Sequence, residues 1–217
     1  MSAFCGMSLP EPDQLLTLVN ARDSSTIVST TVTNDAIING GIWTAAAATY
    51  TTEDGIPCFN HTTANQYATY SGPTVTLGQN YTLFYHCKIR ISDSGWRTFH
   101  RNNLDHLLIG ENGSKDFGMY SNRNGAFRDS GYDLIAGDWQ TIIATGEGDS
   151  PTSSTGTTSI YVNGVLVGTC DRVGCGTSLS RMGYTSQPLG HWSIAGIYNK
   201  TLTPGQITQL HRQIQLK

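Results

Sequence analysis

Short runs of alternating apolar and polar residues, separated by turns that contain glycine or asparagine, cover most of the chain. The clearest run is residues 157–169, in which two β-branched segments flank Asn163 and Gly164. An Asn-Gly pair between such segments favours a type I′ turn, so it predicts a tight antiparallel hairpin. The same alternation predicts further strands at residues 14–19, 26–33, 81–91, 104–110, 117–121, 139–145, 178–184 and 191–198.

The run Tyr81–Ile91 divides into two faces, because successive side chains of a strand point to opposite sides of its sheet. One face is apolar and should line a core between two sheets; it consists of Tyr81, Leu83, Tyr85, Cys87, Ile89 and Ile91. The other face should meet water or a concave surface; it consists of Thr82, Phe84, His86, Lys88 and Arg90.

One helix is expected near the C-terminus. Thr203 supplies a capping hydroxyl, Pro204 suits the first helical position, and Gln206 completes a capping box. The apolar residues that follow recur at helical spacing on one stripe; they are Ile207, Leu210 and Ile214. We expect this helix to lie against the sandwich and to cover an edge or its mouth.

These elements predict an all-β fold: a two-sheet antiparallel β-sandwich with one short C-terminal helix. Residues 1–13 read as an N-terminal leader and residues 14–217 as a single domain, because one sandwich commonly spans 200–250 residues. The stretch 43–50 is placed only as an irregular strand crossing between the sheets. Trp43 and Trp139 are expected in the core.

Several motifs occur in the order found in one known family. Gly137-Asp138-Trp139 precedes a strand and then the Tyr161–Gly168 hairpin, and Tyr81–Lys88 and Trp192–Leu210 fall in step with further motifs. Together they resemble the concanavalin A-like lectin/glucanase superfamily, and specifically its laminin G-type jelly rolls, over about Leu15 to Leu216. One departure is Asn60, which stands where the family often has Asp.

The resemblance implies either an enzyme or a binding module, because the fold carries glucanases and polysaccharide lyases as well as lectins. Retaining glucanases need two carboxylates about 5 Å apart. The family's Glu-x-Asp-x-x-Glu strand is missing, and Glu11, Glu53, Glu111 and Glu147 are isolated in turns. The lyase motifs are missing too, so no catalytic residue and no enzyme activity are predicted.

A calcium site is a second implication of the resemblance, because many laminin G-type modules bind Ca²⁺ at one rim. Hard cations need six to eight oxygen ligands. Such a site could draw on Asp54, Asp105 or Asp138, but no dense acidic loop singles out a residue. No cofactor is therefore predicted, and calcium stays an open alternative.

Charged residues make up only 13% of the chain, and the net charge is −3. Without a cluster of Lys or Arg, the sequence argues against nucleic-acid binding. No apolar run is long enough to span a membrane, and residues 1–16 lack the pattern of a secretory signal. We expect an extracellular or particle-surface location, with an intracellular one left open.

The five cysteines leave at least one thiol unpaired. Cys170 and Cys175 flank a short loop, so they could form a disulfide, stay as separate thiols or supply half of a zinc site. Cys87 alternates with apolar residues and should pack in the core.

Two polar segments and two tryptophans are candidates for ligand contact. In residues 100–106, imidazole, guanidinium and amide groups could hold sugar hydroxyls, and tryptophan rings stack on pyranose rings. The alternative is that 100–106 is only a polar hairpin stabilised by bonds from Asn side chains to the backbone. The candidate residues are Trp96, His100, Arg101, Asn103, Asp105, Asn122, Arg123 and Trp192.

The function expected from these features is a non-catalytic recognition module of the lectin or adhesion type, which binds a glycan or glycoprotein surface. One alternative is a structural protein of a large assembly such as a virus particle, in which edge strands and the helix dock on protein partners. The second alternative is a polysaccharide hydrolase or lyase.

Overall fold

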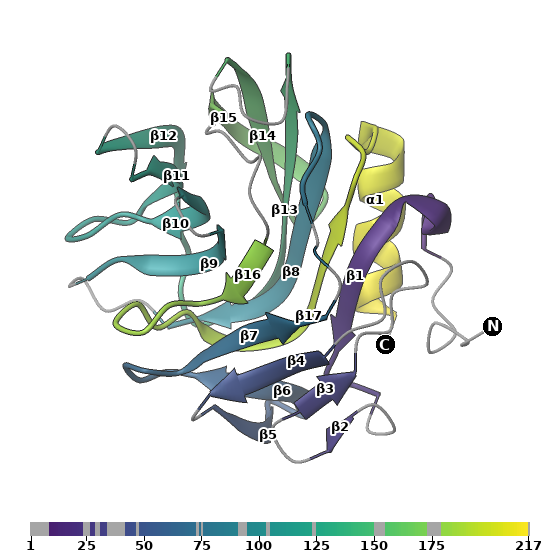
Figure 1. Ribbon diagram of the computed structural model, residues 1–217, viewed down its shortest axis with the longest axis vertical. Helices are drawn as coiled ribbons and strands as arrows, with labels where there is room; N and C mark the ends of the chain where they lie inside the picture. The colour runs from purple at the N-terminus through teal and green to yellow at the C-terminus, as the bar shows by residue number, and fades with distance from the viewer. Residues whose placement is uncertain are drawn as a thin grey trace.

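The computed structural model describes residues 9–23, 27–28, 31–33, 42–46, 48–72, 74, 76–90, 95–102, 105–122, 125–149, 155–172 and 179–216. Within these residues, two antiparallel sheets face each other and one α-helix packs on the outside of one of them (Figure 1). The expected all-β sandwich with one helix near the C-terminus is confirmed.

The first sheet, sheet A, follows the order β15-β14-β13-β8-β17-β6-β5, and β1 also pairs with β17. The long strand β17 is flanked by β8 on one side, while β6 and β1 share its other side. The strands of sheet A are β1 (Leu15–Asn20), β5 (Thr49–Glu53), β6 (Ile56–His61), β8 (Tyr81–Ile89), β13 (Trp139–Gly148), β14 (Gly156–Val162), β15 (Val165–Asp171) and β17 (Gly190–Tyr198).

The second sheet, sheet B, follows the order β12-β11-β10-β9-β16-β7-β4-β3-β2. The chain passes from sheet B to sheet A between β4 and β5, which confirms the crossing expected in residues 43–50. The strands of sheet B are β2 (Ile27–Val28), β3 (Thr31–Thr33), β4 (Ile42–Ala46), β7 (Tyr67–Ser71), β9 (Arg97–Asn102), β10 (Asp105–Gly110), β11 (Asp116–Ser121), β12 (Ala126–Asp133) and β16 (Leu179–Met182).

The hairpin expected at Asn163-Gly164 joins β14 to β15. Val162 pairs with Val165 across it, and both turn residues have positive φ, 51° for Asn163 and 81° for Gly164. A type I′ turn requires this backbone, and Asn and Gly adopt it at the lowest cost.

The core between the sheets contains the alternate residues of β8 that the sequence assigned to it. The side chains of Tyr81, Leu83, Tyr85, Cys87 and Ile89 are at most 1% exposed and belong to one apolar cluster. Aromatic residues from other strands fill the rest of this space, including Trp43, Phe59, Phe99, Phe117 and Trp192.

A second apolar layer lies between sheet A and the helix α1 (Pro204–Gln215). Phe84, on the other face of β8, is fully buried there with Ile207, Leu210 and Ile214 of the helix. The expectation that this face of β8 meets water or a concave surface is therefore wrong for Thr82, Phe84 and His86. The helix covers the outer face of sheet A and not an edge or mouth.

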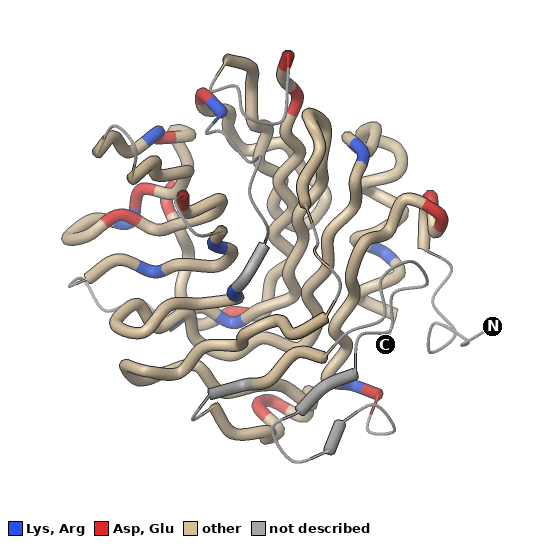
Figure 2. Tube along the Cα trace, viewed as in Figure 1, with Lys and Arg blue, Asp and Glu red and all other residues tan. Residues whose placement is uncertain are grey.

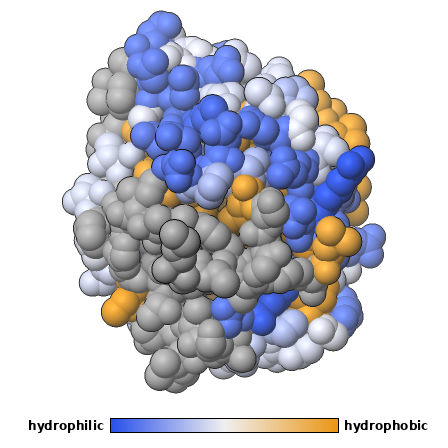
Figure 3. Space-filling model, turned by 90° about the vertical axis from the view of Figure 1, so that its right-hand side faces the viewer, coloured by the Kyte–Doolittle hydropathy of each residue, from blue (hydrophilic) through white to orange (hydrophobic). Residues whose placement is uncertain are grey.

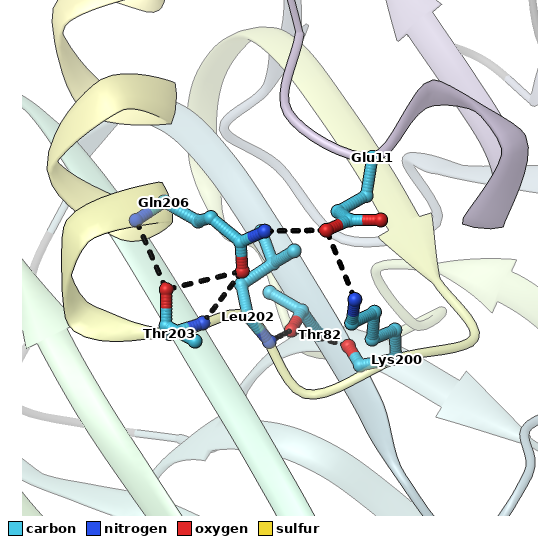
Figure 4. Close-up of polar contacts among 6 residues, drawn as sticks. All are labelled: Glu11, Thr82, Lys200, Leu202, Thr203 and Gln206. Carbon is cyan, nitrogen blue, oxygen red and sulfur yellow. Dashed lines mark hydrogen bonds and ion pairs between the residues drawn. The ribbon is translucent and has the colours of Figure 1, made fainter.

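The N-terminus of α1 is held by a polar cluster that joins three distant segments (Figure 4). The Thr203 side chain and the Gln206 side chain form the expected capping box. The Glu11 carboxylate accepts hydrogen bonds from Gln206 at 2.6 Å and from Lys200 at 2.9 Å. Thr82 of β8 accepts from the backbone N–H of Leu202 at 3.0 Å. The cap thus fixes the helix to the sheet as well as starting it.

Replacement of the capping hydroxyl should measure this contribution. We expect Thr203→Ala to lower the free energy of unfolding by about 1 kcal/mol, because the backbone N–H of Gln206 loses its acceptor. Thr203→Ser keeps the hydroxyl and is the matched control. Urea unfolding of both variants checks the prediction, and equal losses in both would contradict it.

Four histidines are buried, with at most 5% exposure; they are His61, His86, His100 and His106. Burial is the main cause that lowers the pKa, to about 3 for the first three and to about 4 for His106. All four are therefore neutral in the fold at pH values where an unfolded chain, with histidine pKa values near 6.5, takes up protons.

The free energy of unfolding should therefore decrease as the pH falls. The contribution of the neutral histidines is complete above about pH 7 and falls as the pH drops below about 6.5, because only the unfolded chain binds the protons. Each histidine contributes a slope of up to about 1.4 kcal/mol per pH unit until the pH nears its folded pKa. Urea unfolding at pH 7, 6 and 5 measures this. His100→Phe should reduce the slope, and equal stability at all three pH values would contradict the prediction.

Candidate ligand-binding surface on sheet B

The structure places three of the expected contact residues inside the protein. Trp192 is 1% exposed and packs against Phe59 at 4.9 Å between ring centroids. His100 is fully buried, with its ring 4.6 Å from that of Tyr85. Asp105 is also fully buried and accepts a hydrogen bond from the Ser121 hydroxyl at 2.8 Å. The expectation that these residues contact a ligand is wrong, because the core covers them.

The segment 100–106 is largely the polar hairpin that was the alternative interpretation. Its described residues belong to β9 and β10, which pair antiparallel, and the Asn102 side chain accepts from the backbone N–H of Asp105 at 2.6 Å. Asn122 is exposed in the turn after β11. Asn103 and Arg123 lie outside the described residues.

Trp96 and Arg101 both lie on one surface, the outer face of sheet B. The side chains of Ala68, Met119 and Met182 point into the core, so their neighbours Tyr67, Tyr120 and Arg181 point away from sheet A. We call the residues gathered there the outer-face cluster; they are Tyr67, Trp96, Arg101, His106, Tyr120, Arg181 and Tyr184. All are partly exposed except His106, which is 5% exposed.

Tyr184 is the centre of the outer-face cluster. The guanidinium carbon of Arg101 lies 3.9 Å from the centroid of its ring, and that of Arg181 lies 5.7 Å away. Arg181 also lies 5.3 Å from the ring of Tyr67. Both distances to Tyr184 are within the range of cation–π attraction. A hydrogen bond from Arg101 and its charge lower the pKa of Tyr184.

The backbone after β16 explains why Tyr184 reaches Arg101. Gly183 has a φ of 76°, which glycine adopts without strain, and its N–H bonds to the carbonyl of Phe99 at 2.8 Å. The chain then turns back, with the N–H of Gln187 bonded to the carbonyl of Tyr184. This turn places the tyrosine ring over β9.

His106 is the buried member of the outer-face cluster and contacts two of its tyrosine rings. Its ring makes edge contacts with Tyr184 at 5.8 Å and Tyr120 at 6.0 Å, and its Nδ1 hydrogen bonds to the Thr98 hydroxyl at 2.7 Å. Burial, and then the charge of Arg101, lower its pKa to about 4. The imidazole is therefore neutral at pH 7, and the positive charge of the cluster comes from the arginines.

Aromatic rings extend the surface toward β12. Trp96 packs against Tyr120 at 5.0 Å and against Phe127 at 6.0 Å. These three residues are half-buried, so part of each remains accessible to a ligand. Such rings can stack on a sugar ring while an adjacent polar group fixes its orientation.

A pocket of about 460 Å³ lies on the outer face of sheet A, where Lys88, Arg90 and His191 line it with Glu53 and Asn60. Lys88 bonds to Glu53 at 2.6 Å and to Asp54 at 2.7 Å, and these bonds raise its pKa. Burial lowers the pKa of His191. Because the lysine charge is neutralised internally, this pocket offers less unpaired charge to a ligand than the outer-face cluster.

The acidic residues considered for calcium do not gather in the described part of the chain. Asp54 pairs with Lys88, and Asp105 is buried beside Ser121. Among the described residues, no three His, Cys, Asp or Glu side chains are placed to hold a metal ion. Cys87 and Cys170 are buried free thiols; Cys175, the proposed partner of Cys170, lies outside the described residues.

Charges are sparse and dispersed over the described chain (Figure 2). Among the described residues on the face shown in Figure 3, on the side of α1, hydrophilic areas predominate and hydrophobic areas are separated. In the described part of the chain, the one helix is too short and too polar to cross a bilayer.

A family model described as the concanavalin A-like lectin/glucanases superfamily, of laminin G type, matches residues 61–208. The chain belongs to this superfamily. The resemblance seen in the sequence motifs is confirmed. Curated proteins gave no match to the chain.

Solved structures of low sequence identity share the fold. A Trypanosoma rangeli sialidase mutant with trans-sialidase activity has a TM-score of 0.68 at 15% identity, over 99% of this chain and 35% of that one. The same sialidase in complex with sialic acid has a TM-score of 0.67 at 14% identity, over 96% of this chain and 34% of the sialidase chain. Domain 4 of AbnA, a GH43 arabinanase from Geobacillus stearothermophilus, has a TM-score of 0.65 at 15% identity. The match covers 91% of this chain and 98% of the arabinanase domain.

These comparisons correct the expectation of a non-catalytic recognition module of the lectin or adhesion type. The similar chains named above are sialidases and a domain of an arabinanase, which are enzymes, and they give no specific support to a lectin. This chain spans about a third of the sialidase chains. The fold itself is shared by enzymes and non-enzymes.

Sequence reasoning missed Tyr67, His106, Arg181 and Tyr184 as members of the site. They come from three separate segments, at residues 67, 106 and 181–184, which are brought together by the pairing of β16 with β7 and β9 and of β9 with β10. The one local signal was Met182-Gly183-Tyr184, a glycine at the end of a strand followed by an aromatic residue.

The contact between Arg101 and Tyr184 can be tested by titration. We expect Arg101→Gln to raise the pKa of Tyr184 toward its ordinary value near 10, and Arg181→Gln to raise it less. NMR of ring-labelled tyrosine measures the pKa, and Tyr184→Phe assigns the signal. Arg212→Gln, on α1, is the control for net charge. An unchanged pKa in Arg101→Gln would show that the guanidinium does not lie against this tyrosine.

Proposed function

We propose that this chain works as the substrate-holding domain of a carbohydrate-processing enzyme, with the outer face of sheet B as the contact surface. The observation that carries the proposal is the outer-face cluster, in which half-exposed aromatic rings surround Arg101 and Arg181. Stacking on the rings would hold a sugar, and the guanidinium groups would set its orientation.

The layering of the fold supports this choice of surface. The outer face of sheet A is partly covered by α1, and its pocket contains a lysine that is already paired with two carboxylates. Aromatic rings and cationic groups that the core does not need remain on the outer face of sheet B. Partly exposed rings beside convergent polar groups are the usual composition of a ligand site.

The comparisons support the enzyme context. The arabinanase domain, which this chain matches over almost its whole length, was solved in complex with arabinotriose. In the sialidases, the matched region is about a third of a longer enzyme. In the proposal, the ligand is therefore a substrate of an enzyme and not an adhesion receptor.

Calorimetric titration with a panel of oligosaccharides tests the proposal. We expect saturable binding, and we expect Tyr184→Ala to weaken it about tenfold, because a lost stacking contact costs about 1.4 kcal/mol. Trp96→Ala should have a similar or smaller effect, since its ring is at the side of the cluster.

Tyr50→Ala is the matched control, because Tyr50 is an exposed tyrosine on β5 of sheet A, outside the proposed surface. It should leave the affinity unchanged. Absence of binding to the whole panel, or equal weakening by Tyr50→Ala and Tyr184→Ala, would contradict the proposal. Circular dichroism confirms that each variant is folded.

A further inference from the structure

The two arginines of the outer-face cluster are directly opposite each other in sheet B. In the antiparallel pairing of β9 with β16, Arg101 is the partner of Arg181. Side chains opposite each other in such a pair start only about 5 Å apart, and like charges at these positions destabilise the sheet. The structure therefore brings two positive charges together at a cost.

No carboxylate neutralises these two charges among the described residues. The ion pairs of the described chain involve Lys88 with Glu53 and Asp54, and Lys200 with Glu11. Neither Arg101 nor Arg181 takes part in one, and the Nε of Arg101 is buried without a hydrogen-bond partner. The aromatic rings of Tyr184 and Tyr67 offset part of the cost through cation–π contacts.

The rings also hold the guanidinium groups in place. The guanidinium of Arg101 lies over the ring of Tyr184, and that of Arg181 lies within about 6 Å of the rings of both Tyr67 and Tyr184. A guanidinium over an aromatic ring can still present terminal N–H groups to a ligand, and their fork matches two oxygens of a carboxylate or sulfate. Two forks that are already oriented lose little entropy when they bind an oxyanion.

From this geometry we propose that the ligand of the outer-face cluster is an acidic saccharide, whose carboxylate or sulfate ester binds between Arg101 and Arg181 while its sugar ring packs on Tyr184. This inference rests on the proposed function and names its substrate class. His106, neutral in the fold, adds no third charge at pH 7 and so leaves the recognition of the anion to the two arginines.

Titration with matched probes tests the inference. The probes are trigalacturonate, its fully methyl-esterified form, a sulfated disaccharide and the same disaccharide without sulfate. We expect at least one acidic probe to bind ten times or more tighter than its neutral counterpart. The preference for carboxylate or sulfate identifies which source of oxyanion the site takes.

The variants Arg101→Gln and Arg181→Gln should each weaken binding of the acidic probe at least tenfold, while the weak binding of the neutral probe stays within about twofold. Arg101→Lys keeps the charge but loses the fork, so its affinity should lie between those of wild type and Arg101→Gln. Arg212→Gln, on the opposite side of the molecule, should change the affinity for neither the acidic nor the neutral probe. Thermal unfolding confirms that the variants fold.

The outcomes separate this inference from the proposed function. If neutral and acidic probes bind with equal affinity and Tyr184→Ala still weakens both, the inference is overturned and the proposed function stands. If no probe binds to the wild-type protein, both fail. If acidic probes bind tightly but the arginine variants have no effect, the anion binds elsewhere and the inference is again overturned.

Discussion

The burial of β8 on both faces is the constraint on which the rest of the structure depends. One face supplies residues to the core between the sheets, and the other, through Phe84, supplies the layer beneath α1. Hydrogen bonds to β13 and β17 occupy both of its edges. A strand enclosed in this way fixes three layers at once, and the position of α1 follows from it. The capping cluster at Thr203 then holds the helix in register with the sheet.

This layering decides which surface is available for a ligand. Because α1 covers part of the outer face of sheet A, the outer face of sheet B is the one that no α-helix covers within the described chain. The side chains there are not needed for the sandwich core, and so they can be selected for contact with a ligand. The two like charges of Arg101 and Arg181, directly opposite each other in the sheet, cost stability, and the tyrosine rings beside them offset part of that cost.

Most of the fold could be predicted from the sequence, because alternation and turn residues act locally. Asn163-Gly164 predicted its hairpin, and Thr203 with Gln206 predicted the helix start. The site could be predicted only in part. Trp96 and Arg101 were identified by residue type, whereas Tyr184 and Arg181 become neighbours of Arg101 only through long-range strand pairing. The same limit explains the error at Trp192, since the sequence does not show which face of β17 meets the core.

Because the chain carries few charges, Arg101 and Arg181 dominate the electrostatic field at the outer-face cluster. Only 13% of residues are charged, so few other groups contribute to the field around the outer-face cluster. At physiological salt, charges separated by more than about 8 Å are largely screened. Arg101 and Arg181 therefore act on a group that is in contact with them and contribute little to long-range attraction. In the proposal, their role is short-range selection of an anionic group at a fixed position beside Tyr184.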